Sequence, residues 1–121
     1  MINIKHLMDA SDPADGERLW IEPVGLCKDL QEWCAAKHSL PQIAPPKKLW
    51  EWFDEHPDGY DYFRAKYHEH LSKPSCRELL LKLAAAGTRG NFTLLHQGEQ
   101  PDKNTATALY EYLSELQAYV K

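Results

Sequence analysis

Hydrophobic side chains follow two different spacings along the chain, and these spacings predict the order of the elements. Ile2–His6 alternates apolar and polar residues, as a half-buried or edge strand does, and the loop Ser11–Glu17 then ends it. Arg18–Glu22 is rich in Trp and Ile and predicts a second strand that stops at Pro23. The connection is too short for a crossover helix, so these two strands are either antiparallel neighbours or lie apart in the sheet.

The middle of the chain carries the spacing of helices. A brief helix is predicted over Asp29–Lys37, with Asp29 as its cap, and the prolines of Pro41–Pro46 then form stiff connecting chain. Helical spacing resumes at Lys47–His56 and ends at Pro57. The next helix carries a core-facing stripe formed by Tyr60, Phe63, Tyr67 and Leu71.

The last third of the chain predicts a helix, a strand and a helix. Ser75 and Glu78 have the spacing of a capping box, and Gly87 is the expected left-handed residue after the last turn. Phe92–His96 is a continuous apolar run that predicts a central strand covered on both faces. The final helix is expected to begin within Asp102–Thr105.

The order of these elements indicates the fold class. Helix, strand and helix in succession pack most simply as helices on a sheet. We therefore expect residues 1–121 to form a single layered α/β domain, with a small, mostly parallel or mixed sheet and helices packed on it. A chain of 121 residues buries enough surface to fold without a disulfide or a metal.

Composition and charge exclude several classes of function. The net charge is -4, and the basic residues are scattered, which argues against nucleic acid as a partner. The mean hydropathy of -0.60 and the lack of a long apolar run argue against a membrane protein. The first ten residues do not resemble a secretory signal, so a cytoplasmic location is expected. The three cysteines lack CxxC spacing and are expected to be reduced thiols.

The candidate site lies where the strand Phe92–His96 leads into the last helix. In open α/β sheets, ligands bind beyond the carboxyl ends of strands, and a helix N-terminus offers free N–H groups to an anion. The polar connection is expected to form one wall of a crevice and the loop Pro23–Lys28 the other. We therefore predict that a small anionic molecule is bound there by Gly25, Cys27, Lys28, His96, Lys103 and Asn104.

A purely structural interpretation of the same residues stays open. Every connection from a strand to a helix needs polar residues, and Asp102 or Asn104 can act as a cap alone. Gly98 stands without the glycine spacing of a phosphate-binding loop. No nucleophile, base and orienting group can be placed together, so no catalytic residue is predicted and enzyme activity stays undecided. We predict no cofactor.

The histidines do not predict a metal site. His68 and His70 are two residues apart on a helix and point about 200° apart, so they cannot hold one ion. We expect both on a solvated helix surface. His96, at the end of a buried strand, is expected to be a hydrogen-bonded histidine of the core or rim.

One cysteine has a reactive alternative. Cys27 stands next to Lys28 where a helix begins, a position that favours the thiolate of a nucleophile or redox sensor, although no His or Asp partner is placed by the sequence. Cys34 and Cys76 are expected to be buried or unreactive thiols.

A second function from another class rests on the aromatic residues. Most of them fall on the core-facing stripes of helices, which leaves Trp50 and Tyr62 as candidate exposed contacts. The alternative to ligand binding is therefore a non-enzymatic interaction module that docks a protein partner or a second copy of itself as a homodimer.

Several segments together resemble the domain-of-unknown-function family 488 (DUF488), in its short, single-domain bacterial branch. Ala44–Leu71 is similar to that family's Ala-Pro stop, Leu and Trp-Phe helix, proline, and Phe-Arg and Tyr helix. Phe92–Leu113 resembles its Val-Thr-Leu-Leu strand, acidic loop and Leu-rich closing helix, with Asn104, Ala106 and Leu109 at the matching places. Asp12–Gly16 matches its loop of proline and Asp-Gly. The resemblance implies a layered α/β fold and a bacterial cytosolic origin, but no generally established activity.

The chain departs from the family where the family is most site-like. The signature after the second strand is Arg-Leu-Trp-Pro-Arg-Gly, whereas this chain continues with Glu22–Gly25 and has Val24 in place of the second arginine. Cys27 stands where the family has serine, and Lys103 where it has histidine. If that arginine binds an anion in relatives, this chain lacks a bidentate donor, which weakens the case for an enzyme.

Overall fold

The computed structural model describes residues 1–120, apart from the side chain of Lys37. Lys121, the end of the predicted domain, lies outside the described residues. The strands are β1 (Ile2–His6), β2 (Glu17–Trp20), β3 (Ala36–Ser39) and β4 (Phe92–His96). The helices are α1 (Lys28–Trp33), α2 (Lys47–Glu55), α3 (Tyr60–Leu71), α4 (Pro74–Arg89) and α5 (Thr105–Gln117). Short 3-10 helices span Pro13–Asp15 and Pro41–Ile43.

The four strands form one parallel sheet in the order β1-β4-β2-β3. This arrangement confirms the predicted α/β class and the central place of β4, whose five residues are all buried. β1 and β2 lie apart with β4 between them, so the alternative of antiparallel neighbours is wrong, as is a mixed sheet. The register sets Trp20 beside Leu95 and His6 beside His96.

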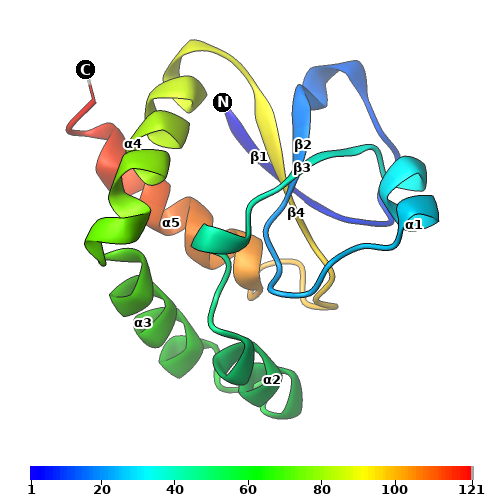
Figure 1. The fold of residues 1–121 in the computed structure, drawn as a ribbon. Helices are drawn as coiled ribbons and strands as arrows, with labels where there is room; N and C mark the ends of the chain where they lie inside the picture. The colour runs from blue at the N-terminus through cyan, green and yellow to red at the C-terminus, as the bar shows by residue number, and fades with distance from the viewer. Residues whose placement is uncertain (121) are drawn as a thin grey trace.

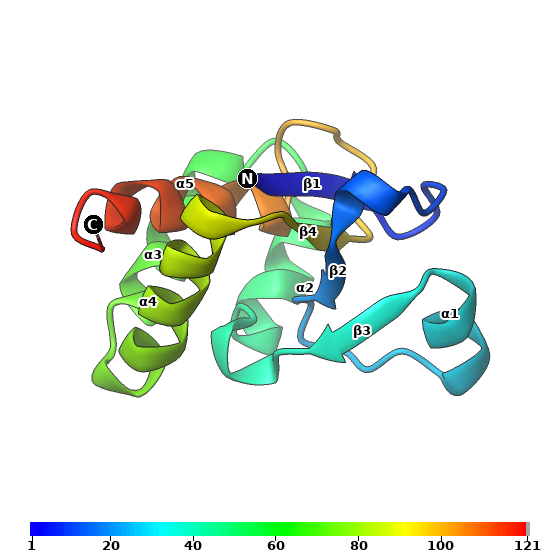
Figure 2. The ribbon, with the colours of Figure 1, turned by 90° about the horizontal axis from the view of Figure 1, so that it is seen from above.

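Helices cover the two faces of the sheet unequally. Figures 1 and 2 show α3, α4 and α5 on one side and the short α1 on the other. The larger core lies under α3–α5 and includes Leu19, Leu94 and Leu109, together with the Tyr60–Leu71 stripe predicted from the sequence. The smaller core lies on the opposite face and consists of Leu7, Trp20, Cys34, Ala36 and Leu95.

The strand β3 was not predicted from the sequence, where the preceding helix was expected to continue through Lys37. α1 instead ends at Trp33, and Ala35 adopts a left-handed backbone with φ 54°. The carbonyl of Cys34, which a longer helix would use internally, accepts a hydrogen bond of 2.8 Å from Nε of Arg18. A contact with a distant strand therefore ends this helix and frees the chain to pair with β2.

The boundaries of α4 also differ from the prediction. The helix begins at Pro74 with Lys73 as its N-terminal cap, and no side-chain cap is made, so the predicted capping box of Ser75 and Glu78 is wrong. Proline suits the first helical position because its missing N–H has no partner there. Gly87 does not end the helix, which runs on to Arg89. It lies buried inside α4 instead.

Gly87 allows close packing between α4, β1 and α5. A Cβ atom at this position would lie 2.7 Å from Cγ1 of Ile2 and 2.9 Å from Nε2 of Gln117. Glycine is therefore kept here for space rather than for a turn.

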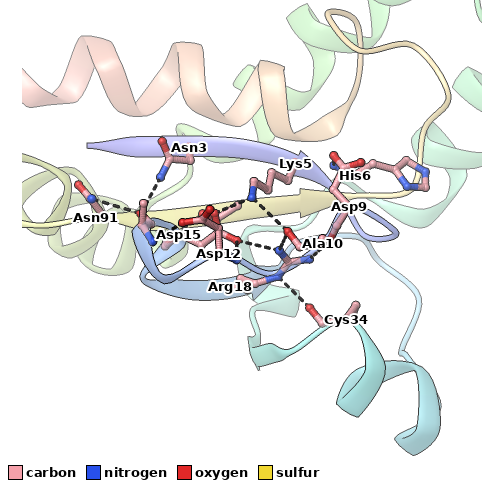
Figure 3. A network of polar contacts seen from close by, with 12 residues as sticks. Asn3, Lys5, His6, Asp9, Ala10, Asp12, Asp15, Arg18, Cys34 and Asn91 are labelled. Carbon is pink, nitrogen blue, oxygen red and sulfur yellow. Dashed lines mark hydrogen bonds and ion pairs between the residues drawn. The ribbon is translucent and has the colours of Figure 1, made fainter.

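A buried arginine organises the loop that crosses from β1 to β2 (Figure 3). Arg18 is 2% exposed, and its Nη1 lies 2.8 Å from Oδ2 of Asp15, while Oδ1 of the same carboxylate lies 2.8 Å from Nζ of Lys5. Nη2 of Arg18 donates to the carbonyl of Asp9 at 2.9 Å, and Nε to that of Cys34. Each nitrogen of the guanidinium thus has an acceptor, as a buried charge requires.

Asp15 links this network to the central strand. Its carbonyl accepts a hydrogen bond of 2.8 Å from the hydroxyl of Thr93 in β4. Burial by itself would raise the pKa of Asp15, but hydrogen bonds with Lys5 and Arg18 outweigh it and hold the pKa below the ordinary value. The carboxylate is therefore ionised at neutral pH and pairs with both cations.

The substitution Arg18→Met is expected to lower the free energy of unfolding by roughly 3–5 kcal/mol, because it leaves Asp15 with one cation and several carbonyls without a donor. Urea unfolding followed by tryptophan fluorescence measures the loss. Arg64→Met is the matched control, because Arg64 pairs with Glu111 at an exposed site (3.4 Å) and its loss should cost about 1 kcal/mol or less. Equal losses in the two variants would contradict the central role of Arg18.

The substitution Gly87→Ala is expected to destabilise the protein by about 1 kcal/mol or more, although alanine is the better helix former. The added methyl group would press on Ile2 and Gln117. Gly90→Ala is the control, because no atom lies within 4 Å of a Cβ built there. Thermal unfolding of both variants measures the difference, and a stabilised Gly87→Ala variant would refute the packing argument.

Candidate functional site

A pocket of about 350 Å³ lies where the chain leaves β2 and β4. Figure 1 shows the connection from β4 to α5 at the same end of the sheet as the chain that leaves β2, with α2 nearby. We call this hollow the strand-end pocket. It is lined by Glu22, Trp50, Phe53, Asp54, Pro57, Gln97, Gly98, Glu99, Gln100, Lys103, Asn104 and Thr105.

The register of the sheet brings the two strand ends together. Trp20 lies beside Leu95, so Glu22 and Gln97, each two residues further on, continue side by side. The backbone N–H of Gln97 donates to Oε2 of Glu22 at 3.2 Å. The predicted convergence of the two strand ends therefore holds for Glu22.

Asn104 and Gln100 fix the loop that forms one wall of the pocket. Oδ1 of Asn104 accepts from the N–H of Thr107 at 2.9 Å and caps α5, as the structural interpretation expected. Its Nδ2 donates to the carbonyl of Gln100 at 2.8 Å. Nε2 of Gln100 donates to the carbonyl of Pro57 at 2.8 Å, which ties the loop to the end of α2. The wall is therefore held in place from both sides.

Glu22 is the unusual residue of this pocket. It is only 3% exposed, and its Oε1 has no partner that meets full hydrogen-bond geometry among the described residues, although the side chains of Thr105 and Trp50 lie near the carboxylate as donors. Burial raises its pKa, and the nearby Thr105 and Trp50 side chains and the Gln97 amide offset part of that rise. A buried carboxylate oxygen without a donor is costly, so its presence in a native fold calls for an explanation.

The charge of the pocket is mainly negative. Glu22, Asp54 and Glu99 line it, with Lys103 as the single basic residue of the lining within residues 1–120. The carboxylate of Glu22 already lies beside Thr105, the first residue of α5, where the anion was expected to bind. This charge is opposite to the one that an anionic ligand requires.

The predicted ligand-binding residues of the β4–α5 connection lie at or beside the pocket. Lys103 and Asn104 line it, although the side chain of Asn104 is engaged in capping. His96 is buried and is not among the lining residues, but it directly precedes Gln97.

The structure does not bring Gly25, Cys27 and Lys28 to the pocket. Val24 and Leu26 pack against the smaller core, and Nε1 of Trp20 donates to the carbonyl of Val24 at 2.6 Å, which draws this loop to the other face of the sheet. Cys27 is exposed at the start of α1, and Lys28 lines a separate hollow with Gln31, Glu32, Ala35 and Ala36. Gly25 is exposed, with no atom within 4 Å of a Cβ built there.

His96 differs from the expected hydrogen-bonded histidine. It is 4% exposed, and its Nδ1 has no partner that meets hydrogen-bond geometry among residues 1–120. Its ring packs edge-on against His6 with the centroids 5.4 Å apart. Burial, together with the neighbouring His6, lowers the pKa of His96 to about 4. The ring is therefore neutral at physiological pH and acts as a packing group.

The remaining candidates have structural roles or lie apart. His68 is half-buried and donates from Nε2 to the carbonyl of Ala108 at 2.7 Å, and His70 is also partly buried, so the expected solvated surface is wrong for both. Cys34 and Cys76 are buried thiols, as expected. Tyr62 is 52% exposed, whereas Trp50 is half-buried and lines the strand-end pocket.

Glu22 was not predicted as a site residue from the sequence. One signal could have indicated it, namely a carboxylate placed directly after the apolar residues Leu19–Ile21 and before Pro23. A charged residue at that place is either exposed to solvent or buried for a functional or structural reason, and only the fold shows which of the two applies.

Two features are absent from the part of the chain that the structure describes. In residues 1–120, no group of three or more His, Cys, Asp or Glu side chains is arranged to hold a metal ion. No helix in that part of the chain has the length and apolar character needed to cross a membrane.

Comparison with known proteins shows the family to which the chain belongs. A family model described as the inactive DUF488-N3 subclade matches residues 1–120. The chain belongs to the DUF488 family. The membership expected from the sequence is thus confirmed. This DUF488 chain is similar to uncharacterized proteins of Mycobacterium bovis and Mycobacterium tuberculosis, each 31% identical over 88 residues, which cover 68% of this chain and 70% of the relative. No solved structure matches it.

The low pKa of His96 predicts a stability loss in mild acid. The unfolded state binds a proton near pH 6.5 and the folded state only near pH 4, so stability falls as the pH drops between these values. At pH 5 the loss attributable to His96 is on the order of 2 kcal/mol. Urea unfolding at pH 7 and pH 5 should show a smaller loss for His96→Gln than for the native chain.

The exposed His38 provides the control, because His38→Gln should retain the full loss in acid. NMR titration of the histidine ring protons gives a direct test. A His96 resonance that titrates near pH 6.5 would contradict the burial argument.

Proposed function

We propose that this DUF488 protein is a non-enzymatic binding protein that holds a small molecule in the strand-end pocket. The observation that carries the proposal is Oε1 of Glu22, a buried oxygen without a well-formed hydrogen bond on a residue that lines the pocket. A ligand that donates to this carboxylate, once the Glu22 side chain turns toward the pocket, would remove the cost of leaving the oxygen unpaired.

The size and lining of the pocket support a small ligand. A volume of about 350 Å³ lies at the lower end of the range of small-molecule sites. The lining combines the aromatic rings of Trp50 and Phe53 with a few polar groups, which is the usual composition of such sites. Because Gln100 and Asn104 hold the loop, the wall is formed before a ligand arrives.

Two observations support binding without catalysis. Among the described residues, the lining contains no Cys, His or Ser, the commonest nucleophiles and bases, and Cys27 lies elsewhere. The matching subclade is also described as inactive.

The three unpaired cysteines support a cytoplasmic location, where thiols stay reduced.

The interaction module is the weaker alternative. Tyr62 is exposed, but its ring packs on Trp52 at 4.7 Å between centroids, and Trp50 is committed to the pocket. An open groove of about 830 Å³ lies between α4 and the strands β2 and β3, with a lining rich in leucine and alanine. No unpartnered buried polar atom belongs to that groove among the described residues. A homodimer through these surfaces stays a prediction.

A fragment screen tests the proposal. Cationic, neutral and anionic fragments are added to the ¹⁵N-labelled protein, and at least one is expected to shift the amides of Gln97, Gly98 and Thr105 and the indole of Trp50. Shifts confined to other surfaces, or none at millimolar concentration, would overturn it.

Two matched substitutions on α2 locate the binding site. Asp54→Trp places bulk at the pocket and should weaken binding about tenfold or more, whereas Glu51→Trp makes the same change of charge on the same helix outside the lining. Both positions are exposed, so both variants should fold. Equal effects of the two variants would place the fragment outside the pocket.

A further inference from the structure

We propose that the ligand of the strand-end pocket is a primary ammonium compound, whose N–H donates to Oε1 of Glu22. This inference rests on the proposed function and adds the chemical class of the ligand. It reverses the charge that was expected from the sequence.

The first step is the unused capacity of Glu22. The N–H of Gln97 occupies Oε2, and the side chains of Thr105 and Trp50 lie near as neutral donors. No salt bridge joins Glu22 to a basic side chain of the described residues. Lys103 lines the same pocket but makes no ion pair with this carboxylate. A buried carboxylate without a counter-ion is costly, and a bound cation supplies both the charge and the hydrogen bond.

The second step is the surrounding charge. Asp54 and Glu99 add negative charge to the lining, which attracts a cation and repels an anion. Trp50 also lines the pocket, with its indole N–H toward Glu22. The carboxylates around Glu22 therefore favour positive charge.

The third step distinguishes the two common organic cations. A guanidinium pairs best with both oxygens of a carboxylate at once, in a fork. In Glu22 one of those oxygens already accepts the Gln97 amide. A primary ammonium needs only the remaining oxygen, so the geometry favours an ammonium over a guanidinium.

Four probes of similar size and different charge test the inference, namely butylamine, butylguanidine, butanol and butyrate. They are titrated at neutral pH into the ¹⁵N-labelled protein, with the Gln97 and Gly98 amides and the Trp50 indole as reporters. Butylamine is expected to bind at millimolar concentration, at least tenfold more tightly than butanol and butyrate and more tightly than butylguanidine.

The variant Glu22→Gln keeps the shape of the side chain and removes its charge. It should bind butylamine at least tenfold more weakly, and no better than it binds butanol. Its fold is checked by its amide spectrum and melting temperature, and it is expected to be stable, because removal of an unpaired buried charge relieves a cost. Glu51→Gln is the control for lost negative charge on the exposed surface of α2 and should bind butylamine like the native protein.

The outcomes separate this inference from the proposed function. If butyrate, butanol or butylguanidine binds the pocket as well as butylamine, the ammonium class is refuted while the pocket stays a binding site. Binding of other fragments at the pocket without any of the four probes refutes the ammonium class in the same way. Butylamine shifts that persist unchanged in Glu22→Gln also refute it. If no compound of any charge reaches the pocket, both proposals fail.

Discussion

The buried guanidinium of Arg18 is the contact on which the arrangement of the sheet depends. It draws together three segments that are separate in sequence, through Asp9 and Asp15 before β2 and Cys34 before β3. A charge in this position has to be satisfied on all sides, so each partner is fixed in place. The helix before β3 ends where it does because its Cys34 carbonyl serves the arginine, and the freed residues extend the sheet.

The strand-end pocket is a consequence of this sheet. Asp15 is held by Arg18 and also accepts from Thr93, which ties the start of β2 to β4. The register that follows sets Glu22 beside Gln97 at the far end. One carboxylate before β2, Asp15, is paired with two cations, and one after β2, Glu22, has no cation partner. The first serves the fold, and the second is the chemically available group.

The loop after β2 lies elsewhere than predicted because of how its apolar side chains pack. Gly25, Cys27 and Lys28 follow a strand that ends at the pocket. From the order of the residues alone, they were predicted to line it. Val24 and Leu26 instead bury their side chains against Trp20 on the opposite face, and the loop follows them. The aromatic residues show a similar effect, because Trp50, predicted as an exposed contact, lines the pocket formed by α2 and the β4–α5 loop.

The sequence by itself determined the fold class and most of the local elements. These elements were predicted from patterns of apolar residues, namely the alternation in β1, the apolar run of β4 and the stripe of α3. Such patterns can be recognised in the sequence without knowledge of distant contacts. The cap of α5 at Asn104 was one of the two caps that the sequence offered, whereas the capping box predicted at Ser75 and Glu78 does not form. Only the tertiary structure decided the insertion of β4 between β1 and β2, the existence of β3 and the burial of Glu22. These features depend on contacts between residues far apart in the chain, which leave no periodic trace in the sequence.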